Sequence, residues 1–283
     1  MSQRLSMAAA IFGLGAIGLS PSLAAQTPEV EVESLIRDNS FLVEEAYNQE
    51  DHVVQEINNF IALGPERDWL YVFTQEWPLG GMKNQLSYTL TLTDPGNLGG
   101  DTGLGDSFVN YRYQVAGGGP ERVAFAPRVS LVIPTGDEKE DRGQGAFGIL
   151  VNLPLSIEFT DRLVGHSNAG GAFIPSAKNA AGDKADVTDY FLGQSLVWLA
   201  RPTLNAVFEA VYTWEEEVTG PGTTESSNSF VINPGLRWAI NRPSGLQIVP
   251  GICVPIGVGP SRGDEALFLY LSFEHPFGKR NSP

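Results

Sequence analysis

The sequence predicts an all-β protein, a transmembrane antiparallel β-barrel of about twelve strands of the bacterial outer-membrane type. Three observations predict it. Short stretches of alternating apolar and polar residues fill most of the chain, their connections alternate in length, and the first 25 residues resemble an export signal. A period of two puts apolar and polar side chains on opposite faces of a strand. A closed sheet of such strands can present apolar groups to lipid and polar groups to its lumen.

Residues 1–25 are expected to form a cleaved signal peptide. Arg4 supplies a positive charge, Met7–Leu19 forms an apolar run, and Pro21–Ala25 provides small residues for cleavage. A membrane anchor is the alternative, but the run is shorter than the ~20 residues that a spanning helix needs. The mature chain would therefore be exported.

Residues 26–51 differ from the rest of the mature chain, because their apolar residues recur at helical rather than strand spacing. These are Leu35, Ile36, Leu42, Val43, Ala46 and Tyr47. The segment is expected to form either a short periplasmic helix or a plug lodged in the lumen. The barrel would occupy residues 52–283.

Alternation within residues 52–283 defines the candidate strands. The clearest is Asn84–Leu92, in which Leu86 and Leu90 face one way and Gln85 and Thr89 the other. The twelve candidates are 52–62, 68–77, 84–92, 106–115, 122–134, 145–159, 162–174, 187–200, 203–216, 227–240, 245–257 and 266–277.

The connections distinguish a membrane barrel from a soluble β-sandwich, which predicts no systematic change in loop length. Tight turns are expected after even-numbered strands, at Thr160–Asp161, Arg201–Pro202 and Asn241–Ser244. Longer loops are expected after odd-numbered strands, at Thr93–Gly105, Thr135–Gln144, Pro175–Asp186 and Glu217–Ser226. Short periplasmic turns and long outer loops produce this order when both termini are periplasmic. The turns at Pro78–Lys83 and Ala116–Glu121 are longer than ideal.

Aromatic residues fall where a bilayer interface requires them. Trp77, Phe159 and Trp238 lie near predicted periplasmic ends, and Trp214 near an outer end. The last strand alternates apolar residues up to Phe277, which is similar to the signal read by the barrel-assembly machinery. Outer-membrane lipid, lipopolysaccharide and that machinery are therefore the expected partners.

Composition excludes other partners. The formal net charge of −15 argues against nucleic acid, since phosphate binding needs clustered Lys and Arg. Cys253 stands alone, so no internal disulfide can form. Asp137, Glu138, Glu140 and Asp141 crowd one loop, but their spacing matches no calcium-binding pattern, and a solvated acidic loop is expected. No cofactor or metal is implied.

Polar side chains on the inward faces are the candidate pore lining. We expect a narrow channel whose field is shaped by three arginines facing three glutamates, although structural pairing without transport would use the same residues. The candidates are Asn110, Arg112, Arg128, Asn152, Glu158, Asn205, Glu209, Asn233, Arg237 and Glu274. Gln114, Gln194 and Gln247 are also assigned inward, as are the apolar Phe108, Leu150, Val207, Phe268 and Tyr270.

Two other classes of function are open. A hydrolytic barrel would use His166, Ser167 and Asn168, but neighbouring residues on a strand point to opposite faces and cannot form one relay. We therefore expect no enzyme. A barrel that only anchors its outer loops at the cell surface predicts no conductance.

Three segments resemble the outer-membrane transporter family named for the meta-pathway of phenol degradation. They are Asn39–Glu50, Gly103–Asp106 leading into Asn110–Tyr113, and Pro127–Ser130 continuing to Ile133–Asp137. The resemblance covers most of residues 39–277 and implies a barrel with a transport role. It transfers no binding residue. In physical terms, Gly103 and Gly105 can adopt positive φ at the end of a loop, and Pro134 is expected to end a strand.

Together these observations predict a channel in the outer membrane of a Gram-negative bacterium that passively admits small molecules, with hydrophobic or aromatic compounds as candidate cargo.

Overall fold

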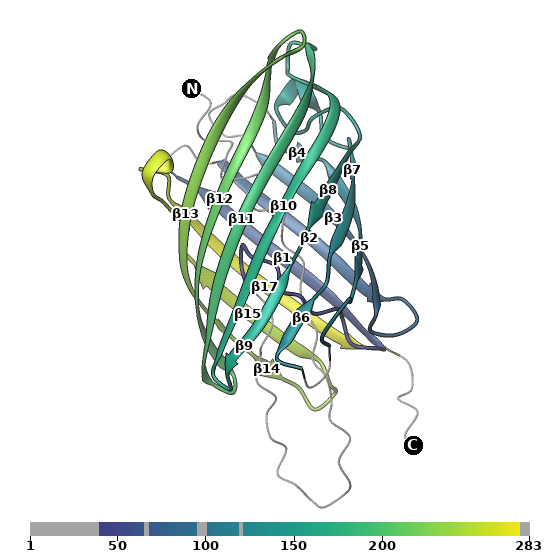
Figure 1. Cartoon of the computed structure of the whole chain (residues 1–283), viewed down its shortest axis with the longest axis vertical. Helices are drawn as coiled ribbons and strands as arrows, with labels where there is room; N and C mark the ends of the chain where they lie inside the picture. Colours follow the sequence, from purple (N-terminus) through teal and green to yellow (C-terminus); the bar gives the residue numbers. More distant parts are fainter. Residues whose placement is uncertain (1–39, 65–67, 95–100, 119–120, 278–283) are drawn as a thin grey trace, which may run out of the picture.

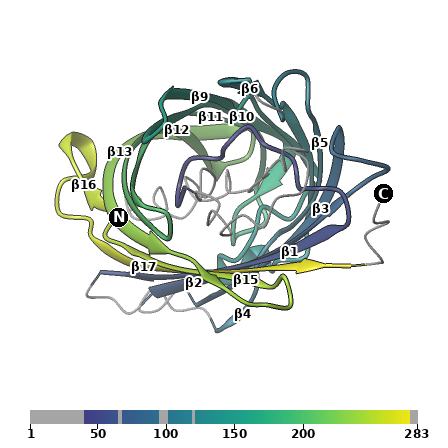
Figure 2. The ribbon, with the colours of Figure 1, turned by 90° about the horizontal axis from the view of Figure 1, so that it is seen from below.

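The computed structural model describes residues 40–64, 68–94, 101–118 and 121–277. They form one closed antiparallel β-barrel of twelve strands, which confirms the predicted fold class (Figures 1 and 2). The helical content of the described residues is two short 3-10 turns, η3 (Glu138–Glu140) and η4 (Gly259–Ser261). Within the described part of the chain, no helix is long and apolar enough to cross a membrane.

Seventeen strand segments make up the twelve strands, because some strands are interrupted. The segments are β1 (Val53–Leu63), β2 (Asp68–Pro78), β3 (Asn84–Asp94), β4 (Gly103–Leu104), β5 (Ser107–Tyr113), β6 (Val123–Phe125), β7 (Arg128–Ile133), β8 (Gly148–Asn152), β9 (Leu155–Thr160), β10 (Leu163–Lys178), β11 (Lys184–Arg201), β12 (Leu204–Gly220), β13 (Thr223–Trp238), β14 (Ile240–Asn241), β15 (Gln247–Cys253), β16 (Ile256–Gly257) and β17 (Ala266–Pro276).

Proline accounts for three of the interruptions. Pro127 separates β6 from β7, Pro154 separates β8 from β9, and Pro255 separates β15 from β16. Proline has no N–H to donate to a neighbouring strand, so the ladder breaks where it occurs. Pro134 directly follows the end of β7, as predicted.

The sheet closes where the first and last strands meet. β1 pairs with β17 along its whole length, from Val53 opposite Pro276 to Leu63 opposite Ala266. We call the end where β1 begins and β17 ends the proximal end, and the opposite end the distal end. The predicted short turns lie at the proximal end.

The structure corrects two of the predicted outer loops. Pro175–Asp186 and Glu217–Ser226 are mostly strand: β10 and β11 extend until only 179–183 connects them, and β12 and β13 until only 221–222 does. Pairing continues from Trp214 opposite Asn228 to Val218 opposite Thr224. Strand pairing is made by backbone groups, so polar residues at these tips can continue the ladder beyond the apolar part of each strand.

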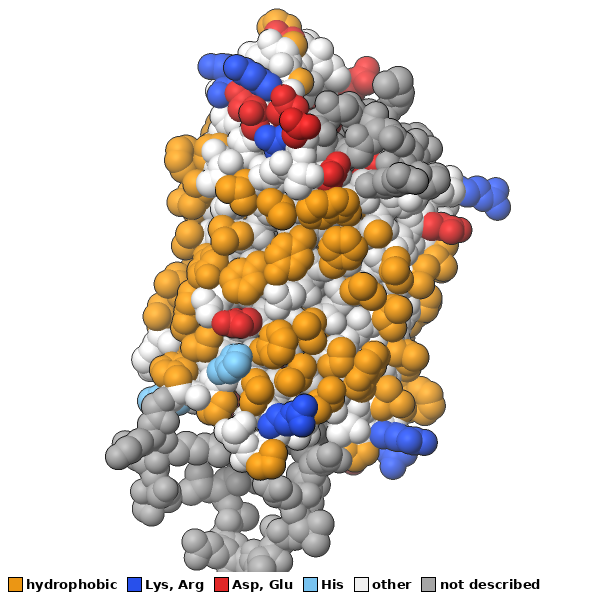
Figure 3. Space-filling model, turned by 180° about the vertical axis from the view of Figure 1, so that it is seen from behind, with side chains coloured by type: hydrophobic (Ala, Val, Ile, Leu, Met, Phe, Trp, Pro, Cys, Tyr) orange, Lys and Arg blue, Asp and Glu red, His pale blue; other side chains and the backbone are white. Residues whose placement is uncertain are grey.

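The outer face is apolar and the inner face mostly polar. Figure 3 shows hydrophobic side chains covering the middle of the face in view, with most charged groups towards the two ends. On β11, for example, Leu192, Leu196 and Trp198 are exposed, whereas Ser195 and Val197 are buried. Trp77, Phe159 and Trp238 lie at the proximal end, and Trp214 packs on Tyr190 towards the distal end with ring centroids 5.6 Å apart. This apolar surface is the one that a bilayer requires.

Candidate functional site: the barrel interior

The interior contains the predicted pore-lining residues. Glu158 is half-buried on the inward face of β9. The other nine are buried: Asn110, Arg112, Arg128, Asn152, Asn205, Glu209, Asn233, Arg237 and Glu274. The apolar candidates Phe108, Leu150, Val207, Phe268 and Tyr270 are also buried inside, as are Gln114 and Gln247. Their role in conduction stays a prediction.

Gln194 is the exception, because its predicted inward orientation is wrong. It lies exposed on the outer face, where its amide accepts a hydrogen bond of 2.6 Å from Ser167 and donates to the backbone oxygens of His166 and Ser195. These local partners satisfy a polar side chain on an otherwise apolar surface.

The segment before β1 runs through the lumen. Residues 40–49 are buried, and Figure 2 shows this stretch curving across the inside of the barrel. Of the two expected alternatives, a short helix is absent from residues 40–51, which are irregular; residues 26–39 lie outside the described part of the chain. These residues do not form the helix that their spacing suggests, because side chains of the lumen wall accept hydrogen bonds from their backbone N–H groups in place of helical carbonyl groups. We call residues 40–49 the plug.

Glu44 is the polar centre of the plug. Its Oε1 accepts from Arg112 Nη1 at 3.0 Å, and its Oε2 accepts from Arg128 Nε at 3.0 Å and from Asn152 Nδ2 at 2.7 Å. Asn168 bonds both the N–H and the carbonyl oxygen of Glu44, at 2.8 and 2.6 Å. A buried carboxylate with two guanidinium partners is stable only while all of these groups are present.

Glu209 holds the backbone just before Glu44. Its carboxylate accepts from the N–H groups of Phe41, Leu42 and Val43 at 3.0–3.1 Å. Asn233 Nδ2 donates to the same carboxylate at 2.7 Å. A lumen glutamate predicted to shape the field of an open pore therefore binds three successive N–H groups of the chain itself.

Phe41 is the apolar anchor of the plug. Its fully buried ring packs edge-on against Phe268 and Tyr270, with centroids 5.6 and 6.1 Å away, and the Arg237 guanidinium carbon lies 5.8 Å from its centre. Gly251 makes room for the ring, since a Cβ there would lie 2.9 Å from Phe41 Cε1.

The last part of the plug is fixed to the opposite wall. Ser156 accepts from Ala46 N–H at 2.8 Å, and Gln114 accepts from Asn48 N–H at 2.8 Å. Gln85 accepts from Gln49 N–H at 2.6 Å. Side chains from several strands thus replace the backbone partners that an isolated extended segment lacks.

The expected pairing of lumen charges is corrected in one respect. The arginines expected to face Glu158, Glu209 and Glu274 were Arg112, Arg128 and Arg237. The carboxylate between Arg112 and Arg128 belongs instead to Glu44, and Glu76 lies 3.9 Å from Arg112. Sequence reasoning missed Glu44 because the partner comes from outside the strands. The available signal was a pair of acidic residues, Glu44 and Glu45, inside an otherwise apolar stretch from Phe41 to Ala46.

The hydrolytic relay is not assembled. Ser167 faces outwards, and Asn168 faces inwards to bind Glu44. His166 Nδ1 lies 2.8 Å from the hydroxyl of Ser156, which also accepts the Ala46 N–H. The Ser156–His166 pair is fully buried beside Tyr47 of the plug and so serves to hold the plug.

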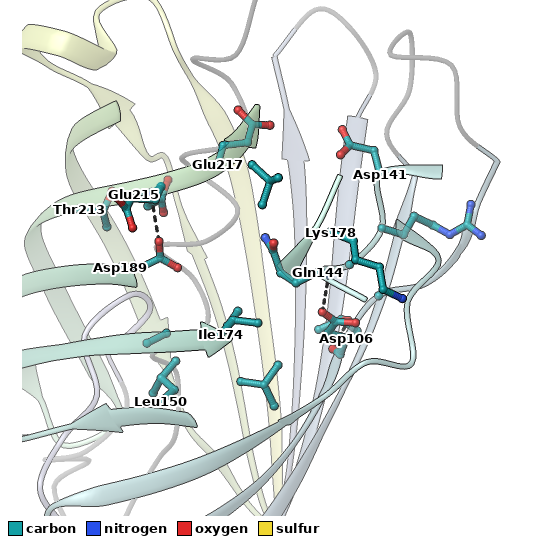
Figure 4. Close-up of a pocket in the computed structure, with 18 of the residues that line it drawn as sticks. Asp106, Asp141, Gln144, Leu150, Ile174, Lys178, Asp189, Thr213, Glu215 and Glu217 are labelled. Carbon is teal, nitrogen blue, oxygen red and sulfur yellow. Dashed lines mark hydrogen bonds between the residues drawn. The ribbon is translucent and has the colours of Figure 1, made fainter. Parts of the chain in front are cut away.

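A cavity of about 260 Å³ remains on the distal side of the plug. Figure 4 shows Asp189, Glu215 and Glu217 on one side of it, Asp106, Asp141 and Gln144 on the facing side, and Leu150 and Ile174 beneath. We call it the distal cavity. Phe108 and Leu150 in its lining are the next inward residues after Asn110 and Asn152, so it lies immediately above the Glu44 network.

The wall of the distal cavity includes the loop between β7 and β8. Asp106 holds this loop by accepting from Gly136 N–H at 3.1 Å and Gln144 N–H at 2.8 Å. Gly103 and Gly105 do not use the positive φ that is open to glycine. Gly105 is needed for close packing, because a Cβ there would lie 2.4 Å from the Thr91 hydroxyl.

The acidic loop residues do not converge on an ion. Asp137 caps η3 by accepting from Lys139 N–H, and Glu138 pairs with Lys178 at 3.3 Å. Among the residues that the structure describes, no three His, Cys, Asp or Glu side chains come together as metal ligands.

No protein-family model matches the sequence, and no curated protein matches it. Solved structures do match. The COG4313 outer membrane channel from Pseudomonas putida F1 is similar with a TM-score of 0.61 and 11% identity, over 79% of this chain and 94% of that one. The NanC porin is similar with a TM-score of 0.54 and 8% identity, over 77% and 98%. At these identities the similarity establishes the fold: this chain has the barrel architecture of outer-membrane channels and porins.

Proposed function

We propose that the protein is an outer-membrane channel that passively admits small molecules and that the plug closes its lumen in the conformation described. The observation that carries the proposal is the way the lumen is used. Side chains at several heights of the wall bind backbone groups of residues 41–49, and two arginines bind Glu44. A wall that only needed to be filled would be filled by its own side chains, as in small barrels.

Hydrogen bonds and ion pairs hold the plug, so it can leave without breaking a covalent bond. Once it leaves, water can solvate Arg112, Arg128 and Glu209, which become a polar pore lining. Phe268 and Tyr270, now covered by Phe41, would form an apolar patch beside them. A lumen of this kind suits small molecules with both polar and apolar parts, which keeps hydrophobic and aromatic compounds as candidate cargo.

The same proposal includes the expected cellular route. Residues 1–25 would direct export and be cleaved, and the final strand up to Phe277 would be read by the barrel-assembly machinery. The apolar belt would then contact outer-membrane lipid, with the distal end among lipopolysaccharide. The resemblance to the transporter family of the phenol meta-pathway supports a transport role and leaves the cargo open.

Conductance in a planar bilayer tests the proposal. The refolded protein should be mostly closed, whereas a variant lacking residues 26–51 should give frequent, discrete, salt-dependent steps. A matched control lacks residues 26–39 alone, keeps the plug and should stay mostly closed.

A folded and inserted barrel that remains silent without residues 26–51 would contradict the proposal. That outcome would favour a structural barrel that anchors its outer loops. If discrete conductance steps are seen, the next measurement is liposome swelling with neutral solutes of increasing size, which gives the size limit of the pore.

A further inference from the structure

We infer that the distal cavity binds small amphipathic cations, molecules that carry a protonated amine on a single ring or an apolar group of similar size. The inference rests on the proposed function in that such molecules would be cargo awaiting passage. It is carried by the lining of the cavity, in which an apolar floor meets an acidic wall.

The floor of the cavity is apolar and fixed. Leu70, Phe108, Val132, Leu150 and Ile174 line it, and each is buried on the inward face of a strand. A cavity of 150 Å³ lined by such side chains binds benzene. The distal cavity, at about 260 Å³, has room for one ring and a short substituent.

The wall above the floor carries an excess of negative charge. Six carboxylates line the cavity, from Asp106, Asp141, Asp189, Glu215, Glu216 and Glu217, against the two basic side chains of Arg142 and Lys178. Both basic side chains are engaged: Lys178 Nζ contacts Glu138 at 3.3 Å, and Arg142 Nη1 donates to the carbonyl oxygen of Asp101 at 2.6 Å. The cavity therefore favours a cation.

Backbone groups hold several of these carboxylates in place without cancelling their charge. Asp189 accepts from Glu216 N–H at 3.1 Å, and Glu216 accepts from Thr188 N–H at 2.9 Å, which bridges β11 and β12 where their ladder ends. Asp106 is held in the same way on the opposite wall. The negative groups are thus positioned before any ligand arrives.

The arrangement suits an organic cation better than a metal ion. Calcium takes six to eight oxygen ligands at close range, and the described carboxylates do not converge in that way. A metal ion also makes no use of the apolar floor. A protonated amine near Asp189 and Glu217, which Figure 4 shows above Leu150, would use the acidic wall while its ring rests on Phe108 and Leu150.

Equilibrium binding to the full-length refolded protein tests the inference with three probes of one shape. Benzylammonium, benzyl alcohol and benzoate are titrated in turn, with ligand-detected NMR as the readout. Benzylammonium should bind more tightly than benzyl alcohol, and benzoate least. The difference should shrink at high salt.

Two variants locate the site. Asp189→Asn keeps an oxygen that can accept the Glu216 N–H, and Glu217→Gln keeps its shape; each should weaken benzylammonium binding about two- to five-fold. Glu121→Gln removes the same charge from an exposed position at the proximal end and should change nothing.

Equal binding of benzylammonium and benzyl alcohol, or equal losses in all three variants, would overturn the inference. The cavity lies outside the plug, so this binding does not require an open lumen. A protein that binds benzylammonium as expected yet never conducts would refute the proposed channel and leave the binding site standing. A protein that conducts but shows no preference for benzylammonium would refute the binding site and leave the proposed channel standing.

Discussion

Both halves of the barrel interior carry charged side chains, but in the proximal half the plug binds them and in the distal half they line a cavity. In the proximal half, buried charges meet partners from the chain itself: Arg112 and Arg128 bind Glu44, and Glu209 binds three N–H groups. In the distal cavity, Asp189 accepts one N–H, from Glu216, and Asp189 and Glu217 line an open space above an apolar floor. Inward polar residues alone therefore do not identify a pore. What decides their role is whether another segment reaches them.

The largest effect is expected from removing the centre of the proximal network. Glu44→Ala would remove the carboxylate that binds both Arg112 and Arg128, leaving Arg112 with Glu76, 3.9 Å away, as its carboxylate partner. Breaking a buried ion pair in this way costs about 3–5 kcal/mol. Docking of the plug should weaken by that order. Hydrogen–deuterium exchange at the amides of residues 41–49 should accelerate, and single-channel openings should become more frequent.

Asp51→Asn is the matched control for Glu44→Ala, because it removes one carboxylate from an exposed side chain next to the plug. It should leave exchange and conductance unchanged. If Glu44→Ala kept the protection of the parent protein, the plug would not depend on its ionic centre, and the contrast between the two halves of the interior would fail.

A smaller effect is expected from crowding the apolar anchor. In Gly251→Ala, the new Cβ would lie 2.6 Å from Arg237 Cγ and 2.9 Å from the Phe41 ring. Overpacking of this kind typically costs about 1–3 kcal/mol. Exchange at the amides of residues 41–43 should accelerate while the outer ladders stay protected.

The same substitution in a Phe41→Ala background tests the cause, since the ring that it displaces is then absent. Gly251→Ala should cost less there, and the difference between the two backgrounds measures the coupling between the two positions. Equal costs would show that the clash is with Arg237 alone.

The smallest effect concerns pH in the distal half. Partial burial raises the pKa of Asp141, and partial burial together with the charges of Asp141 and Glu225 raises the pKa of Glu217. A raised carboxyl pKa means that the proton is taken up at a higher pH than by ordinary carboxyls, which titrate near 4. As pH falls from 7, the cavity should lose negative charge early, and benzylammonium affinity should fall a few-fold.

Titration of binding against pH in the parent protein and in Glu217→Gln checks this expectation. The variant should bind more weakly at pH 7 and show a shallower pH dependence. A parent protein whose affinity changed only around pH 4 would mean that these carboxyls behave as ordinary surface groups.

Much of the fold could be read along single strands. The alternation of Leu86, Tyr88 and Leu90 with Gln85, Ser87 and Thr89 predicted which face of β3 is buried, because side-chain direction on a strand is local. The break after Ile133 followed from Pro134. Gln194 was misassigned because its polarity pointed inwards, whereas its hydrogen bonds to Ser167 and to neighbouring carbonyls allow it to face outwards.

The extent of the outer hairpins could not be read in this way. Thr223–Ser226 is polar enough to be taken for a loop, yet it forms a ladder with β12 as far as Gly220. The pairing depends on a partner strand of matching length, which local composition does not reveal.

The sequence by itself determined that this chain forms a closed antiparallel barrel with an apolar outside and a polar inside, because both follow from a two-residue period repeated twelve times. Only the tertiary structure decided what the polar inside does. Glu44 lies 68 residues from Arg112 and 84 from Arg128 along the chain, and Glu209 lies 168 residues from Phe41. Such pairs form only once the sheet has closed around the plug, which precedes β1 in the chain. They are what makes the proximal half of the interior filled and leaves the distal half as an acidic cavity.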